Sequence, residues 1–284
     1  FIQGTQSTGI GTVAKHFPGK GAATEDAHFD LPIIDLSWGA MVRTHLHPFR
    51  ECIKNGVQGV MTTHVIYPNF PGAEEVPATF DSKLIKGYLR GEMNFTGVVF
   101  SDDLEMGAIS RYFPFKEAVV KTIRAGHDML LICSDYEKQQ FAFQTLLKVG
   151  QVDSNILEEM DEALDRIERL RNFSQRSEYP EELIPENDAA ELAAEIAESS
   201  ITVMRGRVPI PVALAKINKI SAIIPDLSQL ESVEEGFEVG EDNFIERALK
   251  ERFPVPLYTE FIPLDPSKEE IEKAWENASR ADLV

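Results

Sequence analysis

Two groups of side chains have the types and spacing needed to move a proton or to attack an electrophilic carbon. The first is the pair Asp26 and His28, which stand two residues apart in a segment that follows two glycines. A carboxylate that accepts a hydrogen bond from one imidazole nitrogen fixes the tautomer and raises the basicity of the other nitrogen. The pair is therefore typical of an acid/base device working near neutral pH. The spacing alone also fits two unrelated surface residues or, more weakly, a metal-binding pair.

The second group ends the apolar segment VVFSDDLEM, residues 98–106. A buried strand here would deliver Ser101, Asp102 and Asp103 to its carboxyl end. A carboxylate held on a rigid strand suits a nucleophile or an electrostatic stabiliser. One aspartate could instead cap the following helix, a role that suits Asp103. The spacing alone does not decide which of the two aspartates reacts.

These side chains need a scaffold, and the first part of the chain alternates short apolar segments with helical patterns. Four buried strands are predicted, at Gly11–Phe17, Gly59–His64, Gly97–Asp102 and Asp128–Cys133. Strand–helix repetition predicts a parallel sheet. The strand ends HFPGKG, THV and SDD are polar, so the chemistry lies at the carboxyl ends of several strands. Both a (β/α)₈ barrel and an open doubly wound sheet place their sites there.

A second unit follows a break in this pattern. Residues 174–188 contain two prolines and an acidic run, which indicates a linker that leads into a helix from about Ala189 to Ser199. The strands expected beyond it are Ile201–Met204, Ile220–Ile224 and Leu257–Ile262. Trp275 lies on a helical segment of this unit and is expected in its core.

The composition fits a folded, acidic protein. Of the 284 residues, 43% are hydrophobic and 26% are charged, which is enough for a packed core. The net charge of −19 disfavours binding to nucleic acid or anionic membranes, because both are polyanions. No apolar run reaches the length of a membrane-spanning helix. The two cysteines exclude a disulfide framework and a cysteine zinc site.

Four motifs in order resemble glycoside hydrolase family 3, in particular its β-N-acetylglucosaminidase branch. They are KHFPGKG at 15–21, DAH at 26–28, MTTHV at 61–65 and VVFSDDLEM at 98–106. The resemblance runs from about Gly11 to Arg205. One departure is Lys20, which stands where the family usually has a second histidine. It affects the expected loop conformation and sugar contacts rather than the reacting groups.

The resemblance implies a role for each candidate residue. Asp102 corresponds to the nucleophile of a retaining glycosidase, and His28, assisted by Asp26, corresponds to its acid/base. Three further positions correspond to residues that bind the sugar: Lys15, His16 and His64. No metal site and no organic cofactor are implied.

The implied reaction is a double displacement through a glycosyl–aspartate intermediate that releases terminal β-linked N-acetylglucosamine, as found in peptidoglycan fragments or chitin oligosaccharides. A small carbohydrate is thus the expected partner. Two alternatives remain at this point. A neutral imidazole repels phosphate less than a carboxylate does, so the same residues would permit phosphorolysis. The chain could also be a non-catalytic carbohydrate-binding protein, although the intact reactive positions argue against it.

The resemblance also refines the expected α/β fold. Residues 1–173 correspond to the second half of a catalytic (β/α)₈ barrel, because the KHFPG segment normally has four barrel strands before it. Residues 174–200 form a linker and connecting helix, and 201–284 form part of a second α/β sandwich domain. The chain is therefore expected to be an internal fragment with little or no activity by itself. Targeting information would precede Phe1, so no compartment is specified.

Overall fold

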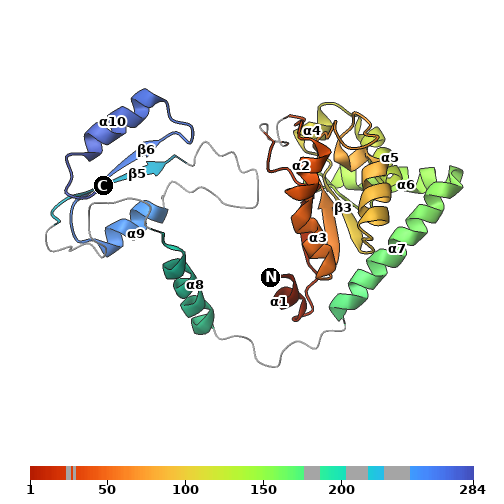
Figure 1. Ribbon diagram of the computed structural model, residues 1–284, viewed down its shortest axis with the longest axis horizontal. Helices are drawn as coiled ribbons and strands as arrows, with labels where there is room; N and C mark the ends of the chain where they lie inside the picture. Colours follow the sequence, from red (N-terminus) through yellow and green to blue (C-terminus); the bar gives the residue numbers. More distant parts are fainter. Residues whose placement is uncertain (24–26, 28–29, 176–185, 203–216, 227–243) are drawn as a thin grey trace. The chain divides into compact units, whose positions relative to one another are not determined.

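The chain forms two units, residues 1–183 and 184–284 (Figure 1). The computed structural model describes residues 1–23, 27, 30–175, 186–202, 217–226 and 244–284. Within these residues, no helix combines the length and the apolar character that crossing a membrane requires.

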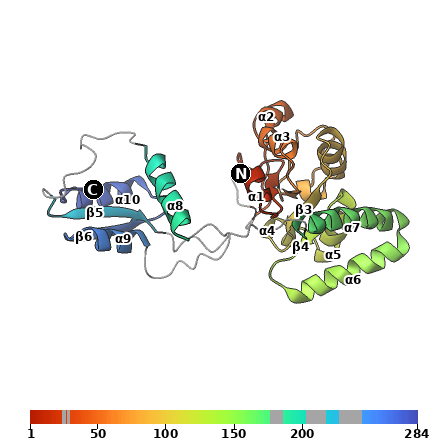
Figure 2. The ribbon, with the colours of Figure 1, turned by 90° about the horizontal axis from the view of Figure 1, so that it is seen from below.

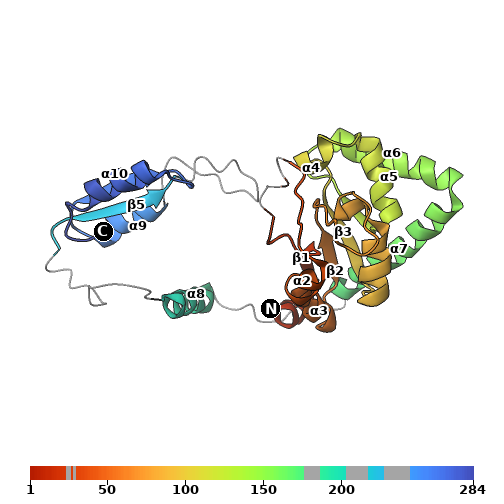
Figure 3. The ribbon, with the colours of Figure 1, turned by 45° about the horizontal axis from the view of Figure 1, so that its top comes forward.

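A four-stranded parallel sheet in the order β1-β2-β3-β4 is the centre of the first unit. Its strands are β1 (Val13–Phe17), β2 (Gly59–Thr62), β3 (Val98–Asp103) and β4 (Met129–Leu131). Figure 3 shows the first three side by side. The predicted parallel sheet is confirmed, and each strand falls within two residues of its expected bounds. Continuous Val, Ile, Leu and Met residues identified these strands because they are buried on both faces.

Helical segments connect the strands and cover the sheet. α1 (Ile2–Gln6) precedes β1, and the connections contain α2 (Trp38–Arg43), α3 (Leu46–Lys54), η1 (Ala78–Phe80), the π-helix η2 (Lys83–Glu92), α4 (Gly107–Ser110) and α5 (Phe115–Ala125). β4 is followed by α6 (Tyr136–Val152) and α7 (Ser154–Gln175). Helices α5, α6 and α7 pack against one another, and α7 also contacts β3 (Figure 2).

The main hydrophobic core of this unit lies between the sheet and the helices α2, α3 and η2. Phe17, Leu46 and Leu89 are fully buried in it. The ring of Phe17 meets that of Phe49 edge to face at 5.3 Å between centroids, an arrangement that aromatic quadrupoles favour. Because Phe17 directly follows Lys15 and His16, the core fixes the strand end that carries these two polar residues.

An ion-pair network holds the beginnings of β3 and β4 together. The carboxylate of Asp128 has no exposed surface and lies 2.6 Å from Arg90 Nη2 and 2.8 Å from Arg166 Nε. It also accepts a hydrogen bond from the amide nitrogen of Val99 at 2.7 Å. Asp128 thus connects η2 and α7 to the sheet at the end opposite Asp102.

We expect Asp128→Ala to lower the free energy of unfolding by about 3–5 kcal/mol, because it removes the buried counter-charge of two largely buried guanidinium groups and leaves Arg166 paired with the exposed Glu162. Chemical denaturation measures this value. The control is Glu117→Ala, which removes an exposed partner of Lys121 and should cost less than about 1 kcal/mol. Equal losses in the two variants would contradict the role of Asp128.

The second unit contains two parallel strands, β5 (Ile220–Pro225) and β6 (Leu257–Ile262). Figures 1 and 3 show α9 (Phe244–Arg252) and α10 (Lys268–Ala278) flanking them, and both helices contact β6. α8 (Glu186–Ser200) precedes the strands. The predictions of both strands and of the helix near 189–199 are confirmed. The third predicted strand, Ile201–Met204, lies partly outside the described residues, and its first two residues form no strand.

The prediction that Trp275 lies in the core of this unit was wrong. Its side chain is 62% exposed, whereas Ala274 and Ala278 on the same helix are buried. Residues four apart share one helix face, and the next residue along is rotated by about 100° from it. Side-chain size alone does not identify the buried face of a short helix.

Candidate active site

The candidate site lies at the carboxyl ends of β1 and β3. His16 Nε2 is 3.6 Å from Asp102 Oδ2, and the two side chains are only 9% and 13% exposed. Ala14 pairs with Val60 and Phe17 with Thr62, so β1 contains one more residue than β2 over this stretch. This bulge lies at Lys15 and His16, and bulges redirect side chains next to sites in many sheets. The structure thus brings together two of the predicted residues, one from each strand.

The turn after β1 requires glycine. Gly19 has a φ of 117°, and a Cβ atom added there would lie 2.7 Å from the Cβ of His45. The Tyr67 hydroxyl donates a hydrogen bond to the Gly19 carbonyl at 3.1 Å, and burial raises the pKa of this hydroxyl. The positive charge of Lys20, in the same turn, is one of the smaller influences that lower the pKa of the buried His64 ring.

Asp102 and Asp103, which spacing alone does not separate, differ in their hydrogen bonds. Asp103 Oδ1 accepts from the amide nitrogens of Glu105, at 3.1 Å, and Cys133, at 3.3 Å. Asp103 therefore connects the loops that follow β3 and β4. Asp102 Oδ1 accepts from the Asp103 amide at 3.0 Å, while its Oδ2 faces His16. Of the two carboxylates, that of Asp102 is the one with an oxygen directed at the His16 ring.

Glu105 supports the same strand end and was not identified from the sequence. Its carboxylate accepts hydrogen bonds from the amide nitrogens of Ser134, at 2.7 Å, and Asp135, at 3.2 Å, and from Lys138 Nζ at 3.0 Å. Burial by itself would raise the pKa of Glu105, but these hydrogen bonds together lower it. The position of Glu105 between β3 and α4 is the only feature of the sequence that could have indicated this role.

His64 is enclosed by the protein. Its side chain has no exposed surface, and both ring nitrogens lie within hydrogen-bonding distance of protein oxygens. Nδ1 lies 2.8 Å from Thr79 Oγ1, and Nε2 lies 2.9 Å from the Asp103 carbonyl oxygen. Burial is the largest influence on this ring and lowers its pKa, which favours the neutral form. The geometry favours support of the strand end over the sugar contact that the resemblance implies.

His127 is a second buried histidine, and sequence reasoning did not identify it. Its Nδ1 donates to the Thr122 carbonyl oxygen at 3.1 Å, and its Nε2 accepts from Thr62 Oγ1 at 2.8 Å. Burial lowers its pKa from an ordinary 6.5 to about 3. Its position just before β4 was the only signal.

The shift of His127 predicts a specific acid sensitivity. Between pH 6.5 and about 3, the His127 ring is protonated in the unfolded chain but stays neutral in the folded protein. Acidification in this range therefore lowers the free energy of unfolding by roughly 1.4 kcal/mol per pH unit. We expect His127→Gln to show a shallower loss of unfolding free energy between pH 6 and 4, measured by urea unfolding at several pH values. Parallel pH curves for the two proteins would contradict this shift.

Asp26 and His28 lie outside the described residues, but Ala27 between them is described. Its side chain is only 3% exposed and packs with Met106 and Ala108. Its carbonyl oxygen accepts from the Ala108 amide nitrogen at 3.0 Å. Ala27 is therefore attached to the segment that begins four residues after Asp102. On the far side of the pair, the Tyr112 hydroxyl donates to the carboxylate of Asp30.

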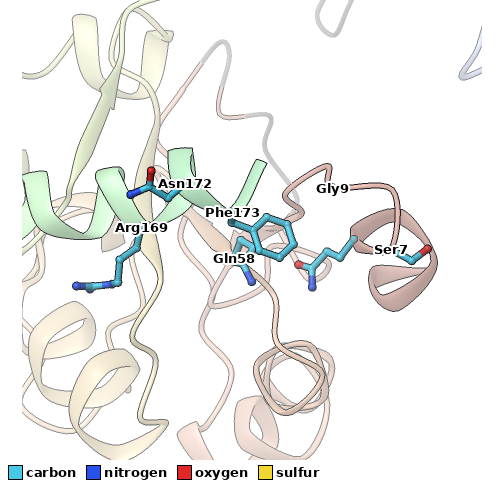
Figure 4. A pocket seen from close by; sticks show the side chains of 7 residues that line it. Ser7, Gly9, Gln58, Arg169, Asn172 and Phe173 are labelled. Atoms are coloured by element: carbon cyan, nitrogen blue, oxygen red, sulfur yellow. The ribbon is translucent and has the colours of Figure 1, made fainter. Parts of the chain in front are cut away.

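Two cavities of about 510 Å³ each lie away from this site. One is at the amino end of β2, where Gln58, Arg169 and Phe173 are among its lining residues (Figure 4). The other is apolar and lies between β4, α6 and α7. Within the described part of the chain, no three or more His, Cys, Asp or Glu side chains are grouped so as to hold a metal ion.

Comparison with known proteins adds a family match over the first unit. The family model described as the glycosyl hydrolase family 3 N terminal domain matches residues 1–170. A β-hexosaminidase of Nitrosospira multiformis is 37% identical over 145 residues, which are 51% of this chain and 41% of the relative. One of Nitrosomonas eutropha is 37% identical over 160 residues, 56% of this chain and 45% of the relative. The chain thus spans less than half the length of these curated relatives.

Solved structures with a similar fold include enzymes of the same kind. A family 3 β-N-acetylglucosaminidase from a Paenibacillus species has a TM-score of 0.77 and 30% identity, and the match covers all of this chain and 54% of the other. A β-N-acetylhexosaminidase from Beutenbergia cavernae has a TM-score of 0.57 and 25% identity, over 61% of this chain and 50% of the other.

Proposed function

We propose that this chain, which belongs to glycosyl hydrolase family 3, carries the nucleophile and the acid/base of a retaining β-N-acetylglucosaminidase. The observation that carries the proposal is the difference between the two aspartates at the end of β3. Backbone amides of two loops donate to Asp103 Oδ1, whereas Asp102 Oδ2 lies 3.6 Å from Nε2 of His16, which belongs to β1 on the other side of β2. The names of the relatives, β-hexosaminidase and β-N-acetylglucosaminidase, support the same activity.

The proposed mechanism has two displacements at the anomeric carbon. Asp102 forms a bond to this carbon while the bond to the leaving oxygen breaks, and His28 gives its proton to that oxygen. The neutral His28 then takes a proton from water, whose oxygen displaces Asp102 and restores the carboxylate. Two inversions give net retention. Asp26 holds the His28 tautomer and stabilises the imidazolium.

Two residues of β1 are proposed to bind the sugar. Lys15 and His16 lie in the bulge at the carboxyl end of the strand, and His16 is adjacent to Asp102. A cationic ammonium and an imidazole N–H both suit hydroxyl oxygens of a sugar, because both can donate hydrogen bonds. Neutral N-acetylglucosamine is also compatible with the net charge of −19.

We further propose that β1–β4 and their helices, residues 1–173, are half of a (β/α)₈ barrel. The order β1-β2-β3-β4, all parallel and joined through helices, supports this, as does the clustering of polar residues at the carboxyl ends. Residues 174–200 would then connect this half to an α/β sandwich domain at 201–284, to which the parallel pair β5 and β6 belongs.

The test is hydrolysis of a chromogenic β-N-acetylglucosaminide by the protein that carries this chain. We expect release of N-acetylglucosamine, with the β-anomer appearing first by NMR, at a rate that does not depend on phosphate. The matched β-glucoside, which carries a hydroxyl in place of the 2-acetamido group, is the control substrate. A sugar phosphate as the main product would show phosphorolysis, and binding without turnover would show a carbohydrate-binding protein instead.

A further inference from the structure

We propose that His64 is a positioning residue for Asp102, which acts through the backbone of Asp103 and does not touch the sugar. The inference rests on the proposed function, because it concerns the nucleophile of that reaction. His64 follows β2, whereas Asp102 lies at the end of β3. The proposal is carried by one chain of hydrogen bonds that begins at fully buried side chains and connects the two strand ends.

The tautomer of His64 follows from its partners. The Asp103 carbonyl oxygen can only accept, so Nε2 must carry the proton at this 2.9 Å contact. In a neutral ring Nδ1 is then an acceptor, and the Thr79 hydroxyl, 2.8 Å away, is its donor. That hydroxyl has a single proton, so its longer contact of 3.1 Å with the Thr63 carbonyl oxygen is not a donated hydrogen bond in this tautomer. Both ring nitrogens thereby have a hydrogen-bond partner, and the side chains of His64 and Thr79 have no exposed surface. A buried imidazole held at two points has a fixed orientation.

The backbone of Asp103, which accepts a hydrogen bond from His64, also donates one to the proposed nucleophile Asp102. In the peptide between Asp103 and Leu104, the carbonyl oxygen accepts from His64, and the amide nitrogen donates to the Leu131 carbonyl at 3.0 Å. The preceding amide nitrogen, that of Asp103, donates to Asp102 Oδ1 at 3.0 Å. The rotation of the Asp102 carboxylate therefore depends on how the backbone of Asp103 is held.

On the Nδ1 side of the ring, Thr79 connects His64 to the segment around the end of β2. Thr79 belongs to η1, and its Oγ1 lies 3.1 Å from the Thr63 carbonyl oxygen and 3.4 Å from Thr62 Oγ1. All three threonines have no exposed surface. His64 therefore connects the segment after β2 to the backbone at the end of β3. Such an arrangement has a use in catalysis, because small displacements of a reacting group cost much rate.

Replacements that keep or remove the Nε2 donor test the proposal. The amide nitrogen of Gln can reach the position of Nε2, whereas that of Asn reaches only the position of Nδ1. We expect His64→Asn to lower kcat by about 30-fold, with KM within about twofold of the native value, because a misplaced nucleophile slows chemistry without weakening binding. His64→Gln should recover kcat to within about threefold of the native value.

The same substitution at two buried threonines is the matched control. Thr79→Val removes the hydroxyl that orients His64, whereas Thr122→Val removes a hydroxyl that donates to the Ala118 carbonyl oxygen within α5. Both side chains are fully buried, so both variants should lose stability. We expect kcat to fall about tenfold in Thr79→Val and less than twofold in Thr122→Val. Equal kcat in the two variants, or a KM increase of tenfold or more in His64→Asn, would overturn the proposal.

A readout without substrate separates this proposal from the proposed function. In the ¹⁵N-labelled protein, the His64 ring should be neutral and protonated at Nε2. The ¹³Cγ resonance of Asp102 should move in His64→Asn and Thr79→Val but not in Thr122→Val. A ring protonated at Nδ1, or an Asp102 resonance indifferent to all three changes, would refute the positioning role even if the enzyme hydrolyses N-acetylglucosaminides. Absent turnover with the expected resonances would refute only the proposed function.

Discussion

Asp102→Asn is expected to reduce kcat on a chromogenic β-N-acetylglucosaminide by on the order of 10⁴-fold or more, the scale seen when a covalent nucleophile is removed. An amide has no negative charge with which to attack the anomeric carbon. Within the described residues, Asp102 accepts a hydrogen bond from the Asp103 amide and faces His16, so the substitution should leave the fold intact. Thermal unfolding at an unchanged midpoint would show this.

Asp103→Asn is the matched control for Asp102→Asn. The amide oxygen of Asn can still accept from the backbone nitrogens of Glu105 and Cys133. A substantial fraction of kcat should therefore survive, within about tenfold of the native value, since a neutral acceptor replaces a charged one. A fluorinated N-acetylglucosaminide that traps the intermediate should label Asp102. Labelling of Asp103 instead would reverse the assignment.

His28→Ala is expected to lower kcat/KM by about 10²- to 10⁴-fold for substrates with poor leaving groups, the usual contribution of a general acid. For aryl glycosides whose phenol leaves without a proton, kcat/KM should change little. This constant reports the steps up to formation of the intermediate, so the later role of His28 as base does not obscure the comparison. The measurement is a plot of kcat/KM against leaving-group pKa.

Asp26→Asn should give a smaller loss than His28→Ala, because it alters the tautomer and basicity of the imidazole but does not remove it. Asp30→Asn is the control for general disturbance of the segment, since Asp30 bonds to Tyr112 outside the pair. An equal loss for good and poor leaving groups in His28→Ala would contradict the acid role.

Local sequence patterns are sufficient to locate the strands of both units. β6 has the predicted bounds, and the four strands of the first unit were found because buried parallel strands read as unbroken apolar runs. The exposure of Trp275 shows the opposite case. Two alanines on α10 form its buried face, and which face of a short helix is covered depends on its neighbours in space.

The sequence by itself determined the family resemblance, the parallel arrangement of the first unit and the set of chemically capable residues at its strand ends, because motifs and periodicity are local properties of the chain. Only the tertiary structure showed how the hydrogen bonds of Asp102 and Asp103 differ. Cys133 lies 30 residues from Asp103 yet donates its amide to that carboxylate. The same holds for His64, whose partners come from η1 and from β3. The hydrogen bonds of Asp103 with Cys133 and with His64 join residues that are 30 or more positions apart in the chain. A local sequence pattern does not indicate which distant residues folding brings into contact.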